Sequence, residues 1–277
     1  MDRDYLTELL NIYWFAPPVA LWRAVELRVA SEESYPRPLL DLGCGDGLIA
    51  SGLFSRDQPV EVGIDPWWEQ VQQAARSGMY RHVDLGDGAR LPYVSRYFAS
   101  AFSNSVLEHI PDIEPVLCEV GRILRPGGTF GFTVPSDAFR YLLDGYRTAM
   151  ESDRSAEADA YANRIDRTLA HYHYHTPDEW RGLLGAAGFR MIKARYYMPE
   201  AAVRLWDRMN GHYGIGRPKS LWGLLASPRL RGLGYQSLLK WSIVRLLSRD
   251  WRAYYEMDVG PGDTGGGLLI VACREEI

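Results

Sequence analysis

The most constraining feature of the sequence is a predicted buried strand that runs through alternate glycines into a helix. Residues 38–42 are apolar apart from Asp41, and Gly43, Gly45 and Gly47 follow at every second position. Glycine lets the backbone turn tightly and lets a ligand approach the main chain closely. The G-x-G-x-x-G spacing of dinucleotide-binding turns is absent. The pattern predicts a nucleotide-type cofactor site at a strand-to-helix turn of an α/β fold.

A second acidic residue lies where the next strand of such a fold would end. Asp65 closes the run Glu61-Val62-Gly63-Ile64-Asp65, 24 residues after Asp41, which leaves room for one helix and its loops. A carboxylate at this place accepts hydrogen bonds from both hydroxyls of a ribose. The spacing therefore predicts one βαβ unit with Asp65 at the ribose. A solvent-exposed carboxylate at a strand end is the alternative for Asp65 taken alone.

Four further segments follow in order: Asp87-Gly88-Ala89-Arg90-Leu91-Pro92-Tyr93, Ala99 to Ser105, Val106 to Ile110, and Gly121 to Gly128. Together with the glycine turn and Asp65, they resemble the class I S-adenosylmethionine-dependent methyltransferases, and most of all the broad small-molecule group of that superfamily. The resemblance covers residues 37–135 and again 171–200. It departs at Phe98-Ala99, where relatives carry Phe-Asp. That acid is normally structural, so the expected cofactor site is unaffected.

The resemblance implies a doubly wound α/β fold with a mostly parallel seven-stranded sheet and helical cap insertions. The last strand, Gly267 to Cys273, pairs antiparallel in this family. A capping box at Thr176-Pro177-Asp178-Glu179 predicts where one core helix begins. The predicted segments are an N-terminal helical segment (1–36), the cofactor-binding core (37–135), a cap insertion (136–176), a core helix with strand six (177–198), a basic Trp-rich helical insertion (199–266) and the last strand (267–277).

The cofactor implied by the resemblance is S-adenosylmethionine, with S-adenosylhomocysteine as its product. Asp41 would orient the methionine amino group, Asp65 would hold the ribose, and Asp87 would face the adenine amino group, with Asp84 as a nearby alternative. Asn104 and Ser105 would line the site near the sulfur. The full set of expected cofactor-binding residues is Asp41, Gly43, Cys44, Gly45, Gly47, Asp65, Pro66, Asp87, Gly88, Asn104 and Ser105.

Three histidines just before the capping box are the candidate catalytic residues. Methyl transfer in this superfamily is a direct displacement, so the protein mainly aligns the partners and removes a proton from the acceptor. Histidine suits that role near neutral pH. In an extended His171-Tyr172-His173-Tyr174-His175 segment, His171, His173 and His175 would share one side and the tyrosines the other. Structural hydrogen bonding is the alternative, and a metal site is a weaker one because no carboxylate lies within the segment.

No metal is expected elsewhere. Some RNA 2'-O-methyltransferases and ubiquinone-pathway O-methyltransferases carry metal ligands in an E-x-x-E-H pattern where this chain has Glu108-His109, but Ser105 replaces the first glutamate. His109 is therefore interpreted as a wall of the site or as a structural residue. Cys44, Cys118 and Cys273 offer neither a disulfide framework nor C-x-x-C spacing, which favours a reducing compartment and argues against zinc.

The second insertion is basic although the chain is acidic. Residues 201–256 contain ten Lys or Arg against three acids, a net +7 in a chain of net −4, with four tryptophans interleaved. This composition suits an anionic amphiphile such as a phospholipid, a polyprenyl-phosphate-linked sugar or an anionic membrane surface. A helical lid with solvated arginines is the alternative. Nucleic acid is disfavoured by the overall acidic balance.

These observations predict a methyltransferase that acts on a small or lipid-linked acceptor by O- or N-methylation. Strand four ends in Ser103-Asn104-Ser105, unlike the proline-rich aromatic motif of amino-directed DNA methyltransferases, which disfavours base methylation. A non-catalytic cofactor-binding scaffold and a non-methyl transferase that uses the same cofactor are the alternatives. With no signal peptide or membrane span recognised, we expect a cytoplasmic protein, with peripheral membrane contact left open. The acceptor and the oligomeric state cannot be read from the sequence.

Overall fold

The computed structural model describes residues 3–214, 221–227 and 234–276, and the chain forms two compact units. The sheet unit comprises Val29–Asp137, Asp166–Tyr196 and Gly267–Ile277. The helical unit comprises Met1–Arg28, Ala138–Ile165 and Tyr197–Gly266. Each unit is therefore assembled from three stretches that are distant in the sequence.

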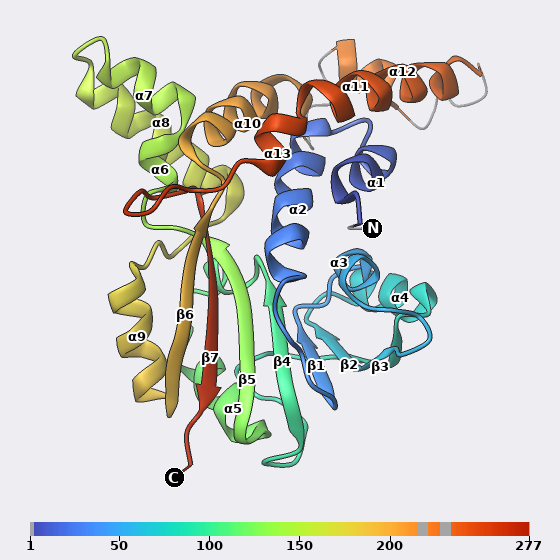
Figure 1. Cartoon of the computed structure of the whole chain (residues 1–277), viewed down its shortest axis with the longest axis vertical. Coiled ribbons are helices and arrows are strands. Elements are labelled where there is room, and N and C mark those ends of the chain that lie inside the picture. Colours follow the sequence, from blue (N-terminus) through green and yellow to red (C-terminus); the bar gives the residue numbers. More distant parts are fainter. Residues whose placement is uncertain (1–2, 215–220, 228–233, 277) are drawn as a thin grey trace. The chain divides into compact units, whose positions relative to one another are not determined.

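Seven strands form one sheet in the order β3-β2-β1-β4-β5-β7-β6 (Figure 1). The pairs β1–β2, β1–β4, β2–β3 and β4–β5 are parallel, whereas β7 runs antiparallel to β5. This confirms the predicted doubly wound, mostly parallel sheet and its antiparallel last strand. The strands are β1 (Leu39–Leu42), β2 (Val60–Asp65), β3 (Tyr80–Leu85), β4 (Phe98–Asn104), β5 (Leu124–Pro135), β6 (Phe189–Tyr197) and β7 (Gly267–Arg274).

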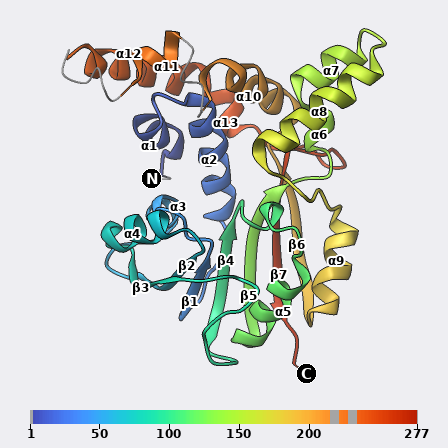
Figure 2. The same cartoon turned by 180° about the vertical axis from the view of Figure 1, so that it is seen from behind.

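The helices of the sheet unit pack against the strands they connect. They are α3 (Leu48–Leu53), α4 (Trp68–Ser77), α5 (Glu114–Ile123), α9 (Pro177–Ala186) and the short 3-10 helix η1 (Leu107–His109). Helix α4 contacts β2 and β3, and α5 contacts β5 and α9 (Figure 2). Every residue of β1 and β4 is buried, as expected for central strands of a covered parallel sheet. The predicted capping box is present, because Thr176 and Glu179 each accept a hydrogen bond from the other's backbone N–H.

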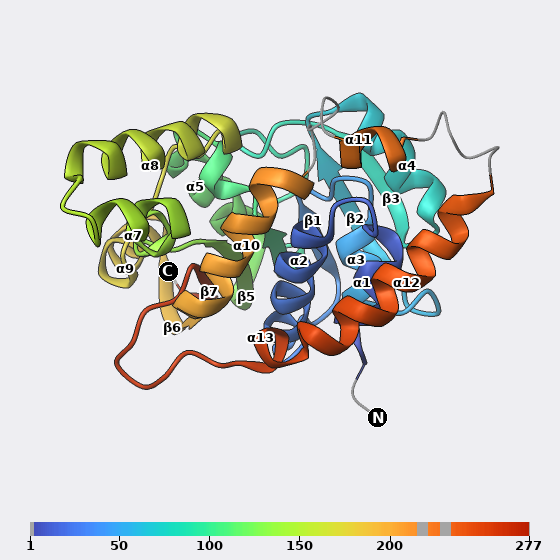
Figure 3. The ribbon, with the colours of Figure 1, turned by 90° about the horizontal axis from the view of Figure 1, so that it is seen from above.

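The helical unit has an aromatic core. Rings of Trp22, Phe139 and Trp206 contact one another at centroid distances of 5.3 to 5.8 Å. Helix α12 packs along α1 (Figure 3). Arg252 forms a bidentate pair with Asp4. The helices of the helical unit are α1 (Tyr5–Ile12), α2 (Pro17–Ala30), α6 (Phe139–Leu142), α7 (Asp144–Met150), α8 (Ser155–Leu169), α10 (Glu200–Tyr213), α11 (Leu221–Leu225), α12 (Tyr235–Asp250) and α13 (Arg252–Glu256), although the last residues of α2 and α8 belong to the sheet unit.

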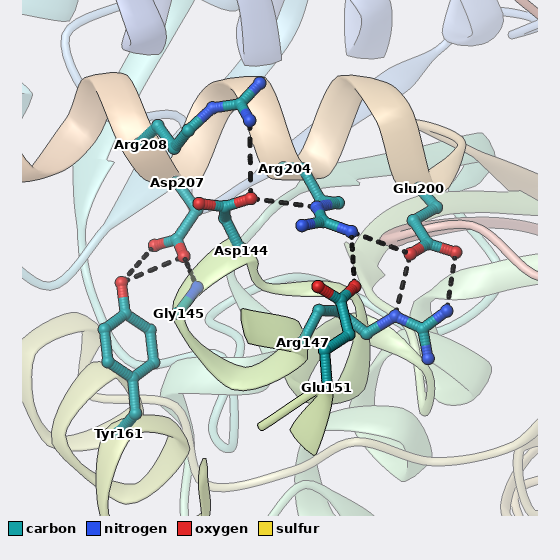
Figure 4. A network of polar contacts seen from close by, with 9 residues as sticks. All are labelled: Asp144, Gly145, Arg147, Glu151, Tyr161, Glu200, Arg204, Asp207 and Arg208. Carbon is teal, nitrogen blue, oxygen red and sulfur yellow. Dashed lines mark hydrogen bonds and ion pairs between the residues drawn. The ribbon is translucent and has the colours of Figure 1, made fainter. Parts of the chain in front are cut away.

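A polar network joins the two insertions inside the helical unit (Figure 4). Arg204 on α10 pairs with Asp144 at 2.8 Å and with Glu151 at 3.0 Å, and Arg208 lies 3.5 Å from Asp144. Asp144 and Glu151, which lie outside residues 201–256, thus compensate part of the positive charge of that stretch. Arg217, Lys219, Arg229 and Arg231, which also contribute to that charge, lie outside the described residues. In the described part of the chain, no helix is both long and apolar enough to cross a membrane.

Candidate functional site

The turn after β1 has the backbone conformation that its glycines predict. Gly43, Gly45 and Gly47 all have positive φ, at 73°, 53° and 83°. A Cβ on Gly43 would overlap the side chain of Val106, whereas a Cβ on Gly45 would meet nothing within 4 Å. Gly43 is therefore required by a close approach within the protein. The main chain at Gly45 is open on the side where a side chain would project, so a ligand can approach it.

Asp41 is buried at the end of β1, where it is 3% exposed. Its Oδ2 accepts a hydrogen bond of 2.7 Å from the hydroxyl of Tyr80, the first residue of β3. Burial raises the pKa of Asp41 to about 7; the Tyr80 hydrogen bond opposes this shift and the nearby charge of Asp65 adds to it. A carboxyl with this pKa favours a cationic partner, because such a partner would stabilise its ionised form.

Asp65 connects the glycine turn to the end of β2. Its Oδ2 accepts from the N–H of Gly45 at 3.0 Å and its Oδ1 accepts from the N–H of Trp67 at 2.9 Å. Each carboxylate oxygen has a second lone pair, so hydrogen bonds from ribose hydroxyls remain available to it. Trp67, two residues after this acid, is 68% exposed. The alternative of a freely exposed strand-end carboxylate does not hold, because Asp65 is only 6% exposed.

The other expected cofactor residues lie in the same unit. Asp87 is exposed and its Oδ1 accepts from the N–H of Ala89, as in an Asx turn, while Asp84 accepts from the Tyr93 hydroxyl. Asn104 ends β4 beside Thr133, and Ser105 follows with φ of 50°. Cys44 is buried, Gly88 is partly buried, and Pro66 is exposed.

Strand pairing brings these segments to one edge of the sheet. Asp41 in β1 is in register with Gly63 of β2 and Phe102 of β4, and all three strands are parallel. Parallel strands present their carboxyl ends at the same edge, which is where ligands bind in doubly wound sheets. An open glycine turn with two buried carboxylates at this edge fits a cofactor that has a cationic amino group and a ribose.

The three candidate catalytic histidines do not all share one side. His173 and His175 stack with a centroid distance of 5.1 Å, as predicted, but Nδ1 of His171 lies 3.0 Å from the hydroxyl of Tyr174. The expected shared side therefore does not extend to His171. The segment is not a regular strand, because Ala170 has φ of 55° and the N–H of His171 donates to Asp166. Burial, with a smaller contribution from His109, lowers the pKa of His171 to about 3.

His171 lies instead beside the 3-10 helix η1. Its ring is 5.2 Å from that of His109, and Nε2 of His109 is 3.8 Å from Oε1 of Glu108. Glu108, His109 and His171 can each offer one ligand atom, and these three atoms lie within 4.8 Å of one another. Spacing along the sequence did not predict this convergence, because His109 and His171 are 62 positions apart.

Comparison with known proteins agrees with this geometry. Residues 40–132 match the family described as methyltransferase domain. The chain is 32% identical over 200 residues to methyltransferase GfsG of Streptomyces halstedii, covering 67% of each protein. The chain belongs to the class I S-adenosylmethionine-dependent methyltransferases. S-adenosylmethionine is accordingly its cofactor.

Other methyltransferases are similar over part of their length or in fold alone. The malonyl-[acyl-carrier protein] O-methyltransferase of Geobacter sulfurreducens is 28% identical over 163 residues, which are 57% of each protein. The chain thus spans little more than half the length of this relative. A solved S-adenosylmethionine-dependent methyltransferase of Thermotoga maritima aligns with 97% of this chain and 99% of its own at a TM-score of 0.58 and 14% identity, which shows a shared fold.

Sequence reasoning did not identify three residues at this candidate site. Tyr80 bonds to Asp41, Val106 packs on Gly43, and Trp67 follows Asp65 with its indole exposed. The first two depend on strand pairing and gave no local signal. Trp67 did give one, because a tryptophan two residues after a candidate ribose-binding acid is suited to contact a nucleoside ring.

Proposed function

We propose that the protein transfers the methyl group of S-adenosylmethionine to an oxygen or nitrogen of a small or lipid-linked acceptor. The open glycine turn between the buried carboxylates Asp41 and Asp65 is the observation that carries the proposal. Oxygen is the favoured acceptor atom, because relatives include malonyl-[acyl-carrier protein] O-methyltransferases and 27-O-demethylrifamycin SV methyltransferase. These relatives also favour methyl transfer over a non-catalytic scaffold or a non-methyl transferase.

The residues of the sheet unit have distinct proposed roles. Asp41 pairs with the amino group of the methionine portion, Asp65 accepts from the ribose hydroxyls, and Trp67 offers an aromatic face to the adenine. Asp87 with Gly88 lies beside the adenine amino group, while Asn104 and Ser105 line the site near the sulfur. When bound, the cofactor supplies a methyl group activated by a positive sulfur.

Removal of the acceptor's proton is the proposed role of the histidine segment. The Nε2 of His173 lies 2.7 Å from the carbonyl oxygen of Ile110, so this nitrogen carries a proton and Nδ1 holds the lone pair of the neutral ring. His175 has its pKa lowered, chiefly by burial, and stacks on His173. Residues 136–176 and 199–266 are the insertions that we propose bind the acceptor.

Calorimetric titration with S-adenosylmethionine and S-adenosylhomocysteine tests the cofactor contacts. We expect Asp65→Ala to weaken binding about 100-fold, because it removes two hydrogen bonds to a charged acceptor. Asp112→Ala, an exposed acid of the same unit, is the control and should bind as the wild type does. Equal affinity in wild type and Asp65→Ala would refute the assigned contact. Mass spectrometry of products from an acceptor screen then tests methyl transfer itself.

An exposed face of α12 supports peripheral contact with an anionic lipid surface. Leu238 and Trp241 are 69% and 56% exposed. They are followed at helical spacing by Arg245, Leu246 and Arg249. The guanidinium of Arg245 lies over the Trp241 ring, 5.1 Å from its centroid. Apolar and cationic side chains on one helix face suit the boundary of an anionic bilayer. The Trp241→Ala, Arg245→Ala double variant should lose sedimentation with phosphatidylserine vesicles at low salt, whereas Arg154→Ala should not. If the wild-type protein does not sediment with such vesicles, the proposed membrane contact is refuted.

A further inference from the structure

Two segments of the sheet unit are held side by side by hydrogen bonds. The N–H of Tyr172 donates to the carbonyl oxygen of Glu108 at 2.8 Å, and Nε2 of His173 lies 2.7 Å from that of Ile110. Nδ1 of His109 lies 3.1 Å from the carbonyl oxygen of Ala170. Residues 108–110 and 170–173 are therefore fixed relative to each other. Side chains from both segments can meet without further ordering.

We propose that Glu108, His109 and His171 bind a first-row divalent transition-metal ion. Their ligand atoms already lie within 4.8 Å of one another, and Glu108 Oε1 is 3.8 Å from His109 Nε2. Tetrahedral ligands about 2.05 Å from zinc are about 3.3 Å apart, so modest side-chain rotations close the site. This inference goes beyond the proposed methyl transfer and does not depend on it.

In both His109 and His171, a hydrogen bond at Nδ1 places the lone pair of the neutral ring on Nε2, where it can bind a metal ion. A carbonyl oxygen only accepts, so Nδ1 of His109 donates to Ala170 and the neutral ring has its lone pair on Nε2. The Tyr174 hydroxyl donates to Asp166 at 2.6 Å and accepts from Nδ1 of His171, which leaves the lone pair of His171 on Nε2 as well. Such outer partners are the usual way in which proteins orient metal-binding histidines.

The donor set indicates which metals suit the site. Two imidazoles with one carboxylate favour zinc, iron, cobalt or manganese over magnesium, which prefers oxygen ligands. Glu108 is 2% exposed at its side chain while His109 is 43% exposed, so the site has a buried anionic end and an open end. An open end leaves coordination positions for water or for an oxygen of an acceptor.

Cobalt titration of chelator-treated full-length protein tests the site, because Co²⁺ replaces zinc and its visible d–d bands report its ligands. We expect one Co²⁺ per chain, displaced by Zn²⁺. His109→Ala should lower Co²⁺ affinity about 100-fold or more, and this exposed position allows the change without a core cavity. His212→Ala, on the exposed surface of α10, is the matched control and should bind normally.

A second variant separates a metal site from a structural cluster. Tyr174→Phe removes the partner that orients His171 and should weaken Co²⁺ binding about 10-fold while one ion per chain is still bound. A folded wild type that binds no Co²⁺ or Zn²⁺ would overturn the inference, as would unchanged affinity and band shape in His109→Ala. These readouts do not involve S-adenosylmethionine, so a failure of the proposed function would not alter them.

Discussion

The hydroxyl of Tyr80 donates a 2.7 Å hydrogen bond to Oδ2 of Asp41 and so joins the start of β3 to the end of β1 across β2. Burial raises the pKa of this carboxyl to about 7, although the hydrogen bond from Tyr80 lowers it. The proposed contact with the cofactor's amino group then depends on pH in a predictable direction.

We predict that S-adenosylhomocysteine binds about tenfold more weakly at pH 6 than at pH 8, because a proton on Asp41 removes the negative charge that the amino group needs. Since the pKa of this acid is raised, the loss occurs as pH falls through about 7. Calorimetry at pH 6 and pH 8 measures the ratio of the two dissociation constants.

The Asp41→Asn variant should bind S-adenosylhomocysteine weakly at both pH values, with a ratio near one. Tyr80→Phe should move the midpoint upward, because the hydrogen bond that lowers the pKa is lost. A pH-independent wild type would contradict the assignment.

Gly43→Ala should destabilise the protein more than Gly45→Ala. Both positions have positive φ, which costs an alanine about 1 to 2 kcal/mol. Only at Gly43 does the added Cβ also overlap Val106, which adds about 1 to 3 kcal/mol of overpacking. Urea unfolding of both variants measures the difference. Val106→Ala in the Gly43→Ala background should recover part of the loss, and equal stability of the two single variants would refute the steric argument.

Tyr161→Phe should lower the free energy of unfolding by about 1 to 3 kcal/mol. Asp207 is 3% exposed and accepts hydrogen bonds from the Tyr161 hydroxyl at 2.8 Å and from the N–H of Gly145 at 3.1 Å (Figure 4). Loss of one donor leaves a buried carboxylate less satisfied. Arg154→Ala breaks only an exposed ion pair with Glu157 and should change stability by less than about 0.5 kcal/mol. Chemical denaturation of both variants would show whether the network stabilises the helical unit.

His173→Ala and His175→Ala should lower kcat on an acceptor found by the screen, with cofactor affinity unchanged, because a general base acts on the acceptor. A positioned base contributes about 100-fold or more to the rate. Tyr172→Phe, at a side chain that is 60% exposed, is the control. Turnover near the wild-type rate in both histidine variants would leave these residues with a structural role only.

Local sequence signals predicted the fold and the cofactor turn well. The alternate glycines, the acid that ends β2 and the capping box at Thr176 each act within a few residues, so their patterns specify local backbone geometry. The histidine segment was less predictable. Its expected alternation assumed an extended strand, and the turn at Ala170 rotates His171 toward Tyr174 and His109.

The sequence by itself determined the order of strands and helices and the glycine turn, because hydrophobic periodicity and glycine conformation depend on near neighbours. The class of cofactor followed from the resemblance of the motifs to those of class I methyltransferases. Only the tertiary structure decided that Tyr80 bonds to Asp41 and that His171 joins Glu108 and His109. It also decided that acids of residues 138–165 neutralise arginines of α10. These contacts join residues 39 to 63 positions apart, and spacing along a chain does not fix which side chains meet once the strands and helices between them have folded.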